Sequence, residues 1–184
     1  MPRSIAHLAF LLLLGTAAPA AAQSETAYDG IYAFAGGESQ RSAFTRAIDE
    51  VVEQMNVVIR GIARQRISAR VKIQPRIVVA SRGDGLFFVH EPLPPRLAKL
   101  DGAARRMVNA AGDRIDVTYT RAGSAIIEAI RSGRSSQRNT YRFAPAHGVL
   151  TFTAEIGSPM MPGVIRYTLT YRRLAAPGAL AARK

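Results

Sequence analysis

The second half of the chain alternates apolar and polar residues with a period of two. In the segment 114–120, Ile115, Val117 and Tyr119 alternate with charged or hydroxyl-bearing residues. This alternation predicts an antiparallel strand with one buried face and one face in water. The neighbouring segments follow the same rule and are joined by short turns rich in glycine and serine. The predicted strands are 30–34, 76–81, 86–90, 104–108, 114–120, 125–131, 137–143, 149–156 and 164–172.

A long amphipathic helix is predicted between the first strand and this meander. From Ser39 to Ile62, apolar residues recur at spacings of three and four, and charged residues occupy the opposite face. This period predicts one helix over about 39–66, with its apolar stripe against the sheet. The pattern leaves its end open, because residues 67–73 fit either an extension of the helix or a strand. Pro75 sets the outer limit.

Sequential hairpins with one apolar face must either curl strongly or close on themselves. The predicted fold class is α+β and mostly β, an antiparallel up-and-down barrel or strongly curled sheet of about eight strands. Closure would remove both unpaired edges of the sheet. Seven apolar or aromatic positions are the candidates for lining the interior. They are Phe88, Val117, Tyr119, Tyr141, Phe152, Tyr167 and Tyr171.

Two interpretations of this lining stay open. A packed core and an apolar pocket with tyrosine hydroxyls as orienting groups require the same residue types. The loop that holds Met160 and Met161 between Pro159 and Pro162 also has two interpretations. The methionines either close the end of the barrel, or form a portal rim or membrane-touching tip through flexible apolar contacts.

The first and last predicted strands carry residues that could meet where a barrel closes. The first strand contains Gly30 and Tyr32, and the last ends in Arg172 and Arg173. This arrangement resembles the calycin barrels, which include lipocalins and fatty-acid-binding proteins. The resemblance implies that Tyr32 is covered by an arginine of the last strand, either Arg172 or Arg173, and Arg172 is assigned as that partner. This chain has Tyr32 where the first strand of those barrels carries a tryptophan. It also has one evident helix where fatty-acid-binding proteins have a pair.

The N-terminus has the pattern of an export signal. Arg3 precedes an apolar run at 5–14, and small residues at 20–22 suit cleavage near Ala22. The run is shorter than the ~20 residues needed to span a bilayer, so we expect no membrane-spanning segment. The expected divisions are a signal peptide at 1–22, one barrel domain at 23–174 and a flexible tail at 175–184. The expected location is the periplasm or the extracellular medium.

Charge and cysteine content narrow the choice of partners. The formal net charge is +12, mostly from arginine, which favours anionic partners. For an exported protein these are anionic lipids or glycans rather than nucleic acid, although an arginine-rich composition also follows from a GC-rich genome. Arg138 and Arg142 alternate with Tyr141 and Phe143, so we expect both arginines outside the barrel. The absence of cysteine excludes disulfides and thiolate metal sites.

Candidate catalytic groups are few. His90 and Glu91 are adjacent in a strand and therefore point to opposite faces, which favours a structural role. Glu155 suits an ion pair with an arginine of a neighbouring strand, while the pattern leaves open whether Glu128 points inward. The sequence contains no nucleophile elbow, phosphate loop or zinc-binding helix motif. We expect no catalytic residues, no metal ligands and no cofactor.

These observations support three hypotheses for function. The first is an exported, non-catalytic binding protein for an apolar or amphipathic, lipid-like small molecule held in the barrel. The second is a cell-envelope interaction module, with a filled barrel and an arginine-rich surface that docks on anionic lipid, glycan or protein. The third is an enzyme whose site has no familiar motif.

Overall fold

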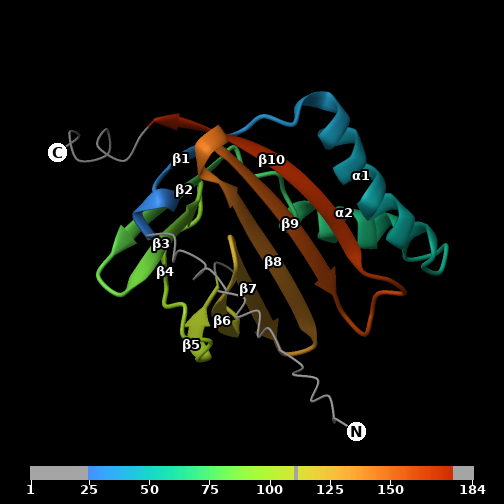
Figure 1. The fold of residues 1–184 in the computed structure, drawn as a ribbon. Coiled ribbons are helices and arrows are strands. Elements are labelled where there is room, and N and C mark those ends of the chain that lie inside the picture. The colour runs from blue at the N-terminus through green and yellow to red at the C-terminus, as the bar shows by residue number, and fades with distance from the viewer. Residues whose placement is uncertain (1–24, 110–111, 176–184) are drawn as a thin grey trace, which may run out of the picture.

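The computed structural model describes residues 25–109 and 112–175. The predicted signal peptide, its cleavage site and residues 176–184 of the predicted tail lie outside these ranges. Ten strands form one antiparallel sheet in the order β4-β3-β2-β1-β10-β9-β8-β7-β6-β5 (Figure 1). The strands are β1 (Gly30–Phe34), β2 (Arg76–Arg82), β3 (Gly85–His90), β4 (Arg96–Ala98), β5 (Arg105–Val108), β6 (Arg114–Ala122), β7 (Ala125–Ser132), β8 (Ser135–Ala144), β9 (Val149–Gly157) and β10 (Ile165–Ala175).

The sheet is strongly curled, which confirms the predicted fold class (Figure 1). All consecutive pairs from β5 to β10 are hairpin neighbours, as the alternation predicts. The strand that the pattern did not predict is β4, which has only three residues and follows the prolines at 92–95. Three residues are too few to show an alternation of period two. Strands β4 and β5 form the two edges of the sheet.

Two helices stand where the periodicity predicts one. They are α1 (Gly37–Glu53) and α2 (Arg60–Arg70), and two short 3-10 turns are η1 (Glu25–Tyr28) and η2 (Pro145–His147). The helix is interrupted at Asn56, whose side chain accepts a hydrogen bond of 3.0 Å from the backbone N–H of Val58. Asparagine favours such local turns over helix, and the β-branched residues that follow it are weak helix formers. The prediction of a single helix over 39–66 was therefore wrong.

The two helices differ in how they meet the sheet. Helix α1 buries Ile48, Val51 and Val52, and it packs against β10. Helix α2 buries no residue, although Ile67 packs partly against the core. Figure 1 shows both helices on the same side of the molecule, beside β9 and β10. None of the helices among the described residues is long and apolar enough to cross a membrane.

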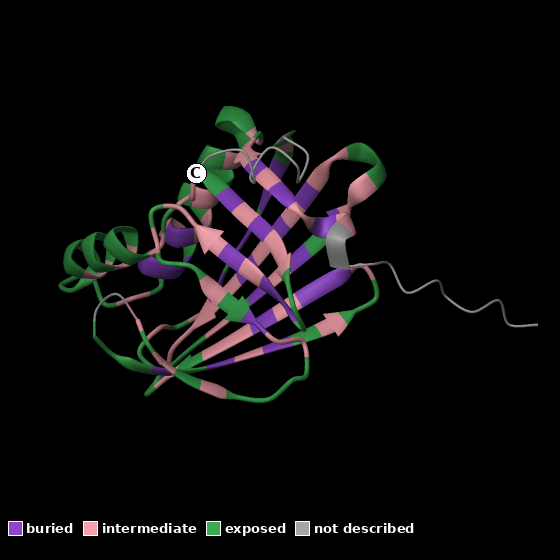
Figure 2. Ribbon diagram, turned by 90° about the vertical axis from the view of Figure 1, so that its left-hand side faces the viewer, coloured by how far each residue is buried: buried purple, intermediate pink, exposed green. Residues whose placement is uncertain are grey.

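The core lies on the concave face of the sheet. The banding of buried and less buried residues along the strands in Figure 2 is the predicted period of two. On β8, for example, Tyr141 and Phe143 are buried, while Arg138 and Arg142 are exposed as predicted. On the outer face, Arg166 Nε lies 2.9 Å from Glu155 Oε1, which confirms the predicted cross-strand ion pair.

Candidate ligand site inside the curled sheet

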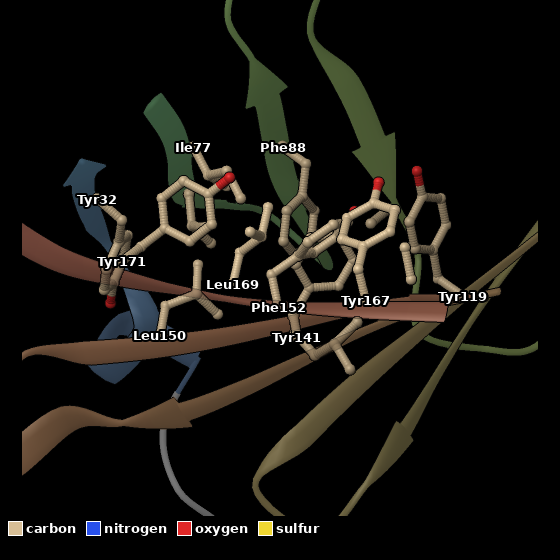
Figure 3. Close-up of a cluster of buried hydrophobic side chains, with 14 of the residues drawn as sticks. Tyr32, Ile77, Phe88, Tyr119, Tyr141, Leu150, Phe152, Tyr167, Leu169 and Tyr171 are labelled. Atoms are coloured by element: carbon tan, nitrogen blue, oxygen red, sulfur yellow. The ribbon is translucent and has the colours of Figure 1, made fainter. Parts of the chain in front are cut away.

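Aromatic side chains line the concave face of the sheet. All seven predicted lining residues are buried, with exposed fractions of at most 8%. Five of them form a continuous group, which we call the aromatic row (Figure 3). Its members are Phe88, Tyr119, Tyr141, Phe152 and Tyr167. Ring centroids within the row lie 4.7 Å apart for Phe88 and Tyr141, and 5.2 Å apart for Tyr141 and Phe152.

The other two predicted lining residues lie beside the row rather than in it. Val117 shares a buried face of β6 with Tyr119. Tyr171 lies with Tyr32 at the other end of the interior (Figure 3). Its ring packs edge-on against Phe34, and its hydroxyl donates a hydrogen bond of 3.1 Å to the carbonyl of Gln74. A ligand-lining role for these seven residues remains a prediction.

A buried carboxylate forms a polar centre within the aromatic row. Glu128 of β7 is 2% exposed and accepts four hydrogen bonds. Arg96 Nη1 and the Tyr119 hydroxyl donate to Oε1, at 2.8 and 2.7 Å. Asn139 Nδ2 and the Tyr141 hydroxyl donate to Oε2, both at 2.7 Å. We call these five residues the polar centre.

Strand register assembles the polar centre. Tyr119, Glu128 and Asn139 are direct partners across β6, β7 and β8, so their side chains point to the same face. Tyr141 lies two residues beyond Asn139 on β8, and so it shares that face. Arg96 comes from β4, near the opposite end of the strand order. Its contact with Glu128 therefore exists only because the sheet curls over.

The charge of Glu128 is stabilised despite its burial. Burial alone would raise the pKa of Glu128, but Arg96 foremost, with the hydrogen bonds from Asn139 and Tyr119, lowers it below the ordinary value. Burial raises the pKa of Tyr141, and the nearby Glu128 raises it further. The carboxylate is therefore ionised and the tyrosine is a protonated donor. Arg96 and Glu128 form a neutral pair in which both carboxylate oxygens are occupied.

His90 joins the polar centre through Tyr141. Burial lowers the pKa of His90 to about 4, against the opposing influence of Glu128, so the imidazole is neutral. Its Nε2 lies 2.8 Å from the Tyr141 oxygen. Because the one hydroxyl proton of Tyr141 goes to Glu128, Nε2 must carry the proton and donate to Tyr141. Glu91 instead faces Arg76 at 3.6 Å, so His90 and Glu91 do not act as a pair.

The residue that covers Tyr32 is Arg173. Its guanidinium carbon lies 5.4 Å from the Tyr32 ring centroid, and Nη2 donates to the Tyr32 oxygen at 2.8 Å and to the Ala27 carbonyl at 2.7 Å. Arg172 is exposed, so its assignment as the closing partner was wrong. On β10 the odd-numbered residues from Ile165 onward point inward, and Arg173 continues that series.

The two methionines of the loop between β9 and β10 differ in exposure. Met160 is 78% exposed, whereas Met161 packs partly against the core. Within the same loop, Gly163 lies beside Val51 near the end of α1. A role for these methionines in a portal remains a prediction.

Two hollows stand out among the described residues, and both lie along α1 outside the curled sheet. The larger, of about 430 Å³, lies between α1, α2 and residues 71–73. Its apolar lining comes from Phe44, Ile48, Val71 and Ile73. Arg64 and Asp49, which form a 3.1 Å ion pair between the two helices, also border it. Within the described ranges, no cluster of three or more histidine or acidic residues could hold a metal ion.

Sequence reasoning missed most of the polar centre. The alternation of period two contains a signal for two of its residues. Ile126 is buried and Glu128 follows it by two positions, while Asn139 precedes Tyr141 by two. Both polar residues therefore fall on the inward face. For Arg96 the sequence gives no such signal, because β4 is too short to show an alternation.

Comparisons with known proteins show a calycin-like fold. A fatty-acid-binding protein of Echinococcus granulosus has 15% sequence identity and a TM-score of 0.50, with 81% of this chain and 98% of that chain covered. A fatty-acid-binding protein of Schistosoma mansoni, in complex with arachidonic acid, has 11% identity and a TM-score of 0.52, with 83% and 100% covered. Lipid binding protein 8 of Caenorhabditis elegans has 14% identity and a TM-score of 0.53, with 83% and 99% covered. No family model matches the chain, and no curated protein does.

Proposed function

We propose that the protein is an exported, non-catalytic binding protein for an apolar or amphipathic, lipid-like small molecule. The observation that carries this proposal is the aromatic row joined to one polar centre on the concave face of a calycin-like sheet. An apolar lining with a few polar groups is the usual composition of a small-molecule site. Neighbours of the same fold are named as binders of fatty acids or lipids. The leader-like segment at 1–22 supports export.

The bonding of Glu128 supports a role without catalysis. A general base must reach the proton that it takes from a substrate. Four protein donors occupy both oxygens of Glu128, and its burial is nearly complete. A guest molecule would instead insert among the rings of the aromatic row. Its apolar groups would then make apolar contacts in place of those between the rings.

Two neighbouring phenylalanines of β3 provide a matched test. Phe88 is 2% exposed and belongs to the aromatic row, whereas Phe87 lies on the other face, where Arg82 covers its ring at 5.3 Å. The purified chain is stripped of lipid and titrated with a fluorescent amphiphile. We expect saturable binding that Phe88→Leu weakens several-fold and Phe87→Leu leaves unchanged. Leucine keeps the site apolar and limits the loss of stability.

The same preparation allows a direct search for a natural guest. Organic extraction before stripping, followed by mass spectrometry, should release a lipid-like molecule in near-stoichiometric amount. No saturable titration together with no extractable lipid would overturn the proposal. Equal effects of the two leucine substitutions on binding would show that the site does not lie on the concave face.

A specific observation also favours the second candidate, a module that docks on anionic lipid. Helix α2 and the turn before it expose Val57, Val58, Ile59 and Ile62, with exposed fractions between 48% and 82%. Arginines of α2, including Arg66 and Arg70, lie on the same exposed helix. Apolar and cationic side chains together suit an anionic membrane surface.

Vesicle binding tests this second candidate. The protein should sediment with vesicles that contain phosphatidylglycerol and not with purely zwitterionic vesicles. Salt should weaken this binding because it screens the arginines. Val58→Ser should reduce binding, whereas Val78→Ser on β2 serves as a control away from the helices. Binding that is absent, or indifferent to both salt and Val58, removes the candidate.

A further inference from the structure

We infer that the interior site takes a neutral, hydroxyl-bearing amphiphile in preference to a carboxylate, because the hydrogen-bond donors that a buried carboxylate needs are already bound to Glu128. This inference rests on the proposed function, since it names the class of molecule bound at the same site. The proposed ligand carries no charge, whereas an ionised fatty acid carries a negative charge.

The hydrogen-bond donors of the polar centre are already occupied. A carboxylate in an apolar interior needs a cation and several hydrogen-bond donors to replace water. The polar centre has these groups, namely Arg96, Tyr119, Tyr141 and Asn139. All four already donate to Glu128. A second carboxylate could reach them only by displacing the protein's own.

The polar centre is also electrically neutral. Arg96 and Glu128 form a pair 2.8 Å apart, so the polar centre carries no net charge. His90 adds none, because burial lowers its pKa to about 4. An anionic head group placed here would meet the negative charge of Glu128 in a poorly screened environment. A neutral head group would meet no such repulsion.

Two groups near the polar centre are available to a neutral head group. The Tyr167 hydroxyl forms no hydrogen bond with any described residue, and the Tyr167 ring contacts Phe44 and Phe152. With Nε2 donating to Tyr141, the Nδ1 atom of His90 is an acceptor without a partner in the described part of the chain. The His90 ring also contacts Phe152. The ring of Phe152 therefore lies between the Tyr167 side chain, which offers a hydroxyl, and the His90 side chain, which offers the acceptor Nδ1.

A ligand hydroxyl matches this pair of groups. It can donate its proton to Nδ1 of His90 or accept the proton of Tyr167, and it brings no charge. The apolar remainder of the ligand then lies along the aromatic row. Long-chain alcohols and monoacylglycerols have this chemistry.

The test compares two probes of equal chain length, lauryl alcohol and laurate, in displacement of a fluorescent amphiphile near neutral pH. We expect the wild-type chain to bind the alcohol at least about tenfold more tightly than the acid. Glu128→Gln removes the negative charge and leaves Arg96 without its counterion, so it should raise laurate affinity at least about tenfold relative to the alcohol. Glu155→Gln, which alters an exposed ion pair, should leave the ratio unchanged.

A second variant keeps the inference testable if Glu128→Gln fails to fold. Tyr167→Phe removes one hydroxyl from the interior and should weaken binding of the alcohol several-fold. Wild-type binding of laurate as tight as that of the alcohol overturns the inference and leaves the proposed function standing. Saturable binding of the amphiphile that neither probe displaces overturns the inference alone, whereas no saturable binding of the amphiphile together with no extractable lipid overturns the proposed function and the inference together.

Discussion

Two arginines lie at opposite ends of the interior, and they are held in different ways. Arg96 reaches from an edge strand to the buried carboxylate of Glu128 at 2.8 Å. Arg173 lies over the Tyr32 ring and donates to two neutral oxygens, those of Tyr32 and Ala27. The first arrangement creates an obligate pair, because loss of either member leaves a charge without its counterion. The second can be lost at the cost of ordinary hydrogen bonds.

Of the substitutions at these two arginine sites, Glu128→Ala should cause the largest loss of stability. Removal of the carboxylate leaves Arg96 and three other donors unpaired, and we expect the free energy of unfolding to fall by about 3–5 kcal/mol. Urea denaturation followed by circular dichroism measures this change. Glu155→Ala removes an exposed carboxylate and should cost no more than about 1 kcal/mol. Equal losses in the two variants would contradict an obligate pair.

Acid should weaken the polar centre before it affects the Tyr32 end. The pKa of His90 is about 4 in the folded protein, against 6.5 ordinarily. The unfolded chain therefore binds a proton more readily, and stability falls as the pH drops from about 6.5 towards 4, by about 3 kcal/mol in all. The pKa of Glu128 is also lowered, so its contribution is lost at still lower pH, below its ordinary value of 4.5.

Urea denaturation across this pH window measures the effect. His90→Phe should flatten the dependence between pH 6.5 and 4, whatever its stability at neutral pH. His147→Phe alters an exposed histidine and should keep the wild-type slope. An unchanged slope in His90→Phe would show that another group is responsible.

A smaller effect is expected at the other arginine. Arg173→Ala removes three hydrogen bonds and a cation–π contact, and we expect a loss of about 2 kcal/mol. Its neighbour Arg172 is exposed, so Arg172→Ala should change stability by less than about 0.5 kcal/mol. Thermal unfolding of the two variants checks the difference. A larger loss of stability for Arg172→Ala would favour Arg172 as the residue that covers Tyr32.

The fold was predictable because it depends on a short, repeated pattern. An alternation of period two marks nine strands, and each turn is short enough to force neighbours to pair. The break between the helices was not visible, because the apolar spacing continues across it from Met55 to Ile59. The interruption comes from one side chain, Asn56, which bonds to the backbone two residues on.

The sequence pattern predicts only which residues of the polar centre point inward from their strands. Period two places Glu128 and Asn139 on the inward face, and strand pairing then brings them together. The contact with Arg96 depends on how far the whole sheet curls, a property of many packed residues that no local pattern contains. The same alternation assigns Arg173 rather than Arg172 to the interior, and so it distinguishes two arginines that the resemblance alone left open.

The position of β1 beside β10 in the middle of the sheet has a consequence for how the protein is made. Tyr32 pairs with Arg173, so the two central strands come from near the beginning and near the end of the described residues. A sheet of this kind lacks its middle until the final strand has left the ribosome, and contacts of such long sequence separation form slowly. The nascent polypeptide therefore cannot complete its sheet before the last strand has been synthesised.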